Sequence, residues 1–147
     1  MIKKYTILIF GGMLANLHPL SGCPEANTAG RADAERYNLY AESMDALPNA
    51  VLVCPFAVDF KKVNELYYRA EIKLTVVAKL KGAKEVGEII QAHLLVESKE
   101  TPKLPLGILR IAFFGRGEGR LLIDSGCFVK YEKDVWQYLE RRNAERN

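Results

Sequence analysis

Strict alternation of residue character from Tyr68 to Leu80 is the feature that most constrains the fold of this chain. Apolar side chains occupy every second position, and charged residues such as Arg69, Glu71 and Lys73 lie between them. Successive side chains of a strand point to opposite faces, so the pattern predicts a long β-strand with one buried and one solvent-facing side. Such a strand is typical of an antiparallel sheet.

Four further segments are expected to form strands beside it. Ala50 to Phe60 is rich in Val and Phe, and its Pro55 favours an edge or a bulge. Glu88 to Glu97 alternates again and forms a hairpin with the long strand. Leu106 to Phe114 is apolar on both faces, which indicates a central strand, and Arg120 to Val129 is expected to pair with it as a hairpin. The residues expected to point inward from the second of these segments are Ile90, Ala92, Leu94 and Val96.

Helical spacing appears at both ends of this strand-rich region. Between Ala32 and Leu47, Tyr37, Tyr40 and Met44 recur at helical intervals and predict an aromatic stripe that faces the core. Residues Glu132 to Asn143 return to the same spacing. The chain is therefore expected to be an α+β domain. Its single curved antiparallel sheet has about five strands, could curl into a barrel, and is flanked by an N-terminal and a C-terminal helix.

The first residues have the order of an export signal. Lys3 and Lys4 are followed by an apolar run from Tyr5 to Leu17, and then by the small residues Ser21 and Gly22. Glycine, asparagine, histidine and proline interrupt the run, so it falls short of the ~20 apolar residues that a membrane-spanning helix needs. A permanent transmembrane anchor is therefore disfavoured.

The segment from Leu20 to Cys23 reads L-S-G-C and resembles the lipobox of bacterial lipoproteins. The resemblance implies that the Cys23 thiol receives a diacylglycerol and that the chain is cut directly before this residue. It implies a signal peptide at residues 1–22. The residues that follow, 23–31, are small and polar and are expected to form a tether, and residues 32–147 are long enough for one domain. The mature protein would be held by lipid at the periplasmic or external side of an envelope membrane. An ordinary secretory signal and an uncleaved helix are the alternatives.

The chain has three cysteines, an awkward number for an exported protein. If Cys23 carries lipid, Cys54 and Cys127 remain as a pair that an oxidising envelope could join in a disulfide. Two separate buried thiols are the alternative, because both lie beside apolar strand residues. No C-x-x-C redox motif is present.

Charge and motifs exclude several functions. Residues 1–22 hold two of the 21 basic and none of the 18 acidic residues, which leaves 19 against 18 and a formal charge of +1, so no nucleic-acid partner is expected. The string from Gly115 to Gly119 could suggest a phosphate loop, but it joins two expected strands and is better explained as a hairpin turn. The basic residues on and after the long strand could meet anionic lipid headgroups, although glutamates interleave with them.

The mature chain has few residues that could act in catalysis. Its single histidine, His93, is expected on the outward set of its strand, and a relay of His93 with Ser125 or Asp124 has no local signature to support it. One histidine also limits metal binding, because zinc sites draw three or four ligands from His, Cys and carboxylates. We therefore expect no catalytic residue, no metal and no cofactor.

These inferences favour a non-enzymatic envelope lipoprotein whose small disulfide-bonded domain binds or helps to assemble another envelope component. The stretch from Cys54 to Tyr138 also resembles the netrin-type modules of metalloprotease inhibitors, with a cysteine before the first long strand and another near a late helix that contains Trp136. That resemblance implies a secreted inhibitor or a small-ligand-binding barrel. The modules carry more cysteines, and the amino-terminal cysteine that inhibits has no counterpart here if Cys23 is acylated. A hydrolase that uses His93 ranks last.

Overall fold

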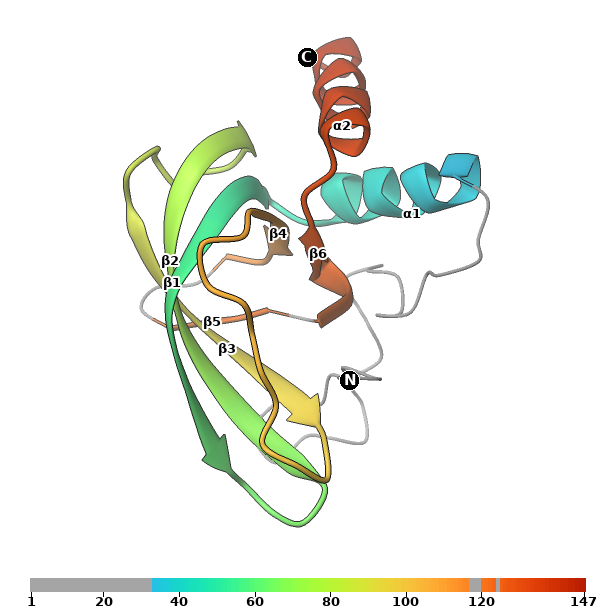
Figure 1. Ribbon diagram of the computed structural model, residues 1–147. Coiled ribbons are helices and arrows are strands. Elements are labelled where there is room, and N and C mark those ends of the chain that lie inside the picture. The colour runs from blue at the N-terminus through green and yellow to red at the C-terminus, as the bar shows by residue number, and fades with distance from the viewer. Residues whose placement is uncertain (1–32, 117–119, 124) are drawn as a thin grey trace.

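The chain folds as an α+β domain with a single sheet and a helix at each end. The computed structural model describes residues 33–116, 120–123 and 125–147. The elements run in the order α1 (Asp33–Ala46), β1 (Asn49–Lys62), β2 (Tyr67–Lys81), β3 (Ile89–Glu97), β4 (Arg110–Phe114), β5 (Arg120–Leu122), the 3₁₀ turn η2 (Ser125–Cys127), β6 (Phe128–Lys130) and α2 (Lys133–Glu145). The predicted fold class is confirmed (Figure 1).

The sheet is open and has six strands in the order β5-β3-β2-β1-β4-β6. Within the described residues it does not close on itself, so the barrel form allowed by the sequence is not adopted. All strand pairs are antiparallel except β3 with β5, where Ala92 lies opposite Leu121 in parallel register. The hairpin predicted for residues 106–129 is wrong in part, because β6 pairs with β4 while β5 crosses to the far edge.

The long alternating strands share one buried row. Val58 lies opposite Ile72, Ile72 opposite Ala92, and Ala92 opposite Leu121, so four strands contribute adjacent side chains to the core. The inward set predicted for β3, from Ile90 to Val96, is buried. The next residues along each strand point to the other face, called the outer face below.

Both helices lie on the side of the sheet opposite the outer face (Figure 1). Tyr40 and Met44 of α1 are buried in the core, and Tyr37 packs against its edge, which confirms the predicted aromatic stripe. From α2, Trp136 and Leu139 enter the same core. Neither helix of the described chain is long and apolar enough to cross a membrane.

Pro55 occupies the position that its chemistry favours. β1 pairs with β4 only from Asn49 to Val53, so from Cys54 onward it has an open edge on that side, where a residue without an N–H is tolerated. The carbonyl of Pro55 accepts a hydrogen bond of 2.8 Å from the Gly107 amide. Gly107 has a φ of +77°, and this turn explains why β4 begins at Arg110 rather than at Leu106.

Candidate functional site

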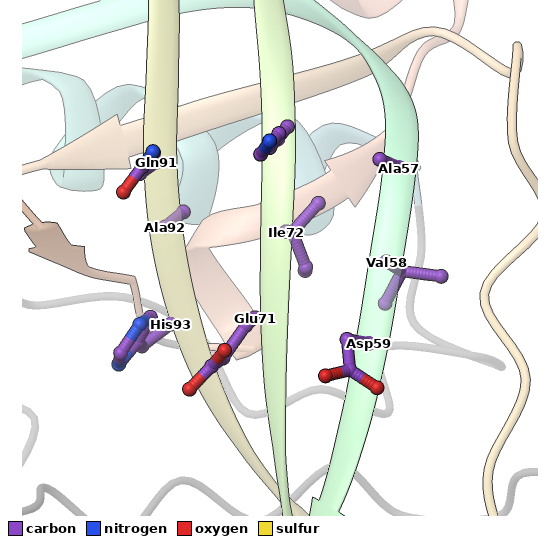
Figure 2. Close-up of a pocket in the computed structure, with 9 residues that line it drawn as sticks. Ala57, Val58, Asp59, Glu71, Ile72, Gln91, Ala92 and His93 are labelled. Atoms are coloured by element: carbon purple, nitrogen blue, oxygen red, sulfur yellow. The ribbon is translucent and has the colours of Figure 1, made fainter.

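A hollow of about 380 Å³ lies on the outer face, over the three longest strands. The described residues that line it come from β1, β2 and β3, so the hydrogen-bonded ladder fixes the spacing of their backbones (Figure 2). They are Ala57, Val58, Asp59, Glu71, Ile72, Lys73, Gln91, Ala92 and His93.

Strand register sorts the polar side chains of the hollow into two rows. In the first row, Asp59 lies opposite Glu71, and Glu71 lies opposite His93. In the second, Lys73 lies opposite Gln91 on one side and the small Ala57 on the other. Figure 2 shows the first row at one level of the three strands.

A β-bulge shapes the rim of the hollow on β1. Pro55 lies opposite Leu74 and Ala57 lies opposite Lys73, which leaves Phe56 as an extra residue in the ladder. Phe56 is exposed although it is large and apolar, and it has no partner in the ladder between β1 and β2. The small Ala57 methyl leaves open the space that the hollow occupies.

Glu71 is held in place by two cations. Its Oε2 lies 3.1 Å from Nζ of Lys61, and its Oε1 lies 3.1 Å from Nη2 of Arg69. The hydrogen bond from Lys61 lowers the pKa of Glu71 below 4.5; partial burial opposes this shift, and the charges of Lys61, Arg69 and His93 lower the pKa further. The carboxylate is thus ionised and already paired.

Three other polar groups of the hollow have no such partner. Asp59, Lys73 and Gln91 make no ion pair and no side-chain hydrogen bond within the described part of the chain. Two opposite charges and one amide therefore remain available to a bound molecule. By contrast, the neighbouring basic residues predicted as a lipid-facing surface are mostly neutralised, since Lys79 pairs with Glu85 and Lys84 pairs with Glu88.

His93 lies on the outward set of β3, as predicted, and is partly exposed. Its backbone carbonyl accepts a 3.1 Å hydrogen bond from the Ile123 amide. Asp124 and the side chain of Ser125 lie outside what the structure describes, so the relay with His93 stays a prediction. Among the described residues, no three His, Cys, Asp or Glu side chains are grouped closely enough to hold a metal ion.

The cysteines do not pair as the sequence predicted. Cys54 has a free thiol, with its Sγ 3.9 Å from the Pro55 carbonyl oxygen. Cys127 is buried. The expected Cys54–Cys127 bond is therefore wrong. β4 lies between β1 and the start of β6, so the strand that carries Cys54 and the strand that follows Cys127 are about 10 Å apart. A disulfide spans at most ~7 Å between Cα atoms.

The sequence-predicted lipid site cannot be placed, because Cys23 lies outside the described residues, as do the signal peptide and the tether. Part of the glycine string lies there too, although the Gly115 backbone, which accepts a 3.1 Å hydrogen bond from Asn49 Nδ2, is described. Sequence reasoning missed the hollow. Its signal was the alternation of opposite charges on the outward positions of two adjacent strands, which identifies a site only once the register is known.

No family model matches this chain, and no curated protein or solved structure matches it.

Proposed function

We propose that this protein is an envelope lipoprotein, cut before Cys23 and anchored through acyl chains on that residue, whose domain has a non-catalytic binding or assembly role. The L-S-G-C segment carries the proposal, because it follows a basic start and an apolar run in the order that an export signal requires. Each buried methylene contributes ~0.8 kcal/mol to membrane binding, so two or three acyl chains hold a small domain stably.

The distribution of polar groups over the sheet supports a binding role for the domain. The helices and the 3₁₀ turn contribute apolar side chains to the core on one side of the sheet, while the outer face has a hollow with uncommitted groups on paired strands. Side chains on paired strands hold their geometry better than side chains on loops, which favours recognition of a defined ligand or partner.

The sulfur of Cys23 can carry either a lipid or a disulfide. Cys23 is the third cysteine of the sequence, beside Cys127 and Cys54, whose thiol is free. One sulfur atom cannot carry both a thioether-linked lipid and a disulfide. Acylation of Cys23 and a bridge from Cys23 to Cys127 are therefore mutually exclusive, and an experiment on Cys23 decides between them.

Metabolic labelling with a radioactive fatty acid tests the anchor. We expect label on the wild-type chain and recovery of the chain with membranes, and we expect the Cys23→Ser variant to lose both. Cys54→Ser is the matched control, because it removes a thiol that is free in the structure, and it should keep both label and membrane association. Equal labelling and equal membrane recovery of the wild type and Cys23→Ser would refute the anchor.

A further inference from the structure

Asp59 and Lys73 lie on two neighbouring strands, β1 and β2. Asp59 lies opposite Glu71, two residues before Lys73 on the neighbouring strand, so Asp59 and Lys73 are diagonal neighbours on the outer face. Diagonal neighbours of an antiparallel pair lie roughly 7–8 Å apart, and their Cβ atoms are somewhat closer. The hollow thus presents an uncommitted negative and an uncommitted positive group on backbone positions that the strand register fixes.

Glu71 lies between these two charged groups but leaves both available to a ligand. Lys61 and Arg69 already neutralise its carboxylate, so it does not draw Lys73 away from the hollow. Lys73 lies directly opposite Gln91, and the ammonium and amide N–H groups can both donate to one anionic group. The Asp59 carboxylate can then accept hydrogen bonds from a cationic group of the same ligand.

We propose that the hollow binds a short zwitterionic peptide, with its carboxylate on Lys73 and Gln91 and its ammonium group on Asp59. An extended chain advances about 3.3–3.6 Å per residue, so the two charged ends of a dipeptide are about as far apart as the backbone positions of Asp59 and Lys73, and the flexible Lys73 side chain can adjust its ammonium group to the carboxylate. The amide of Gln91 can also pair with a peptide bond. A volume of about 380 Å³ falls within the range of small-molecule sites.

This inference deepens the proposed binding role but does not need the lipid anchor. A titration on the purified chain and the labelling of Cys23 in cells measure different properties, so either can fail alone. Phosphoethanolamine carries the same pair of charges on a phosphate, as a lipid headgroup does, and it serves as the competing probe.

The test is an NMR titration of the full chain, purified in detergent, with dialanine, N-acetyl-dialanine and dialanine amide. We expect saturable shifts of amides around residues 57–59, 71–73 and 91–93, and an affinity for dialanine about two- to fivefold above either blocked form, as an exposed ion pair provides. Lys73→Gln should abolish the preference over the amide and keep the preference over the acetylated form. Asp59→Asn should do the reverse.

Lys99→Gln is the matched control, since Lys99 is exposed in the connection after β3 and should change neither preference. The proposal is overturned if the three peptides bind equally, if the shifts lie outside the hollow, or if no saturable shift occurs. Tighter binding of phosphoethanolamine than of dialanine would overturn the peptide assignment and give the hollow to a lipid headgroup.

Discussion

At the scale of single residues, Asn49 connects three segments that are distant in sequence. Its Nδ2 donates to the carbonyls of Phe114 and Gly115, at 3.4 and 3.1 Å, and its Oδ1 accepts a 3.2 Å hydrogen bond from the Ala83 amide. The residue is buried, so each lost partner would leave a backbone group without a hydrogen bond. Asn49 thereby joins the start of β1 to the β2–β3 turn and to the end of β4.

The turn beside Asn49 predicts a contrast between two glycines. Gly82 and Gly87 both have positive φ, +111° and +89°. A Cβ at Gly82 would collide with Asn49, 2.9 Å from its Cγ, whereas a Cβ at Gly87 would meet nothing within 4 Å. Gly87→Ala should cost about 1 kcal/mol of unfolding free energy from backbone strain, and Gly82→Ala about 1–3 kcal/mol more. Urea denaturation of both variants measures this, and equal losses would contradict the role given to Asn49.

Glu71 predicts a pH dependence of stability. Because its pKa is lowered in the folded chain, its contribution is present above the unfolded value of about 4.5 and is lost as the pH falls through the lower folded pKa. Glu71→Gln should therefore flatten the fall in stability below pH 4.5, as measured by urea unfolding at a series of pH values. Glu97→Gln, an exposed residue of the same sheet region, is the control and should retain the wild-type slope. Identical profiles for wild type and Glu71→Gln would contradict this prediction.

At the scale of elements, α2 is docked by a few polar contacts around an apolar centre. Arg36 of α1 donates to both oxygens of Glu132, at 3.0 and 3.1 Å, and Asp45 pairs with Arg142 and Arg146. Exposed pairs contribute little free energy, so they orient the helix more than they hold it. The buried residues of α2 provide most of its attachment.

Truncation of that apolar centre should be costly. Leu139 of α2 is fully buried in the core, and Leu139→Ala should lower the free energy of unfolding by about 2–5 kcal/mol through lost burial and a residual cavity. Arg141→Ala, on the exposed side of the same helix, should change it by less than about 0.5 kcal/mol. Similar urea midpoints for the two variants would show that α2 is not part of the cooperative fold.

The sequence predicts helices and strands well where one face of the element is buried and the other is exposed to solvent. β2 and β3 differ from the predicted Tyr68–Leu80 and Glu88–Glu97 by one residue at most at each end, because period two is unambiguous over such lengths. Both helices follow from their spacing in the same way.

Pairing between distant strands could not be predicted in the same way. Three residues of β5 carry too little pattern to reveal a parallel partner in β3, and a glycine-rich turn before them suggested the simpler hairpin. The candidate site could not be predicted for the same reason. Asp59, Glu71 and His93 form one row only because the bulge at Phe56 sets the register of β1 against β2, and a bulge leaves no periodic trace in the sequence. The cysteine pairing failed for the same reason, since strand order decides which sulfurs can meet.

At the scale of the whole molecule, the proposed anchor at Cys23 would hold at a membrane a domain whose described residues form a hollow on the outer face of the sheet. The helices lie beside one end of the sheet, on the side opposite the hollow (Figure 1). The hollow lies over the middle of β1, β2 and β3. A ligand that reaches the outer face thus meets paired strands rather than the helices.

The intact mass of the chain extracted from membranes tests the anchor most directly. We expect a chain that begins at Cys23 and carries the added mass of at least two acyl chains. A chain that retains residues 1–22 would contradict this expectation. So would a chain without acyl mass that is two hydrogens lighter than its sequence requires, as a bridge between Cys23 and Cys127 would make it.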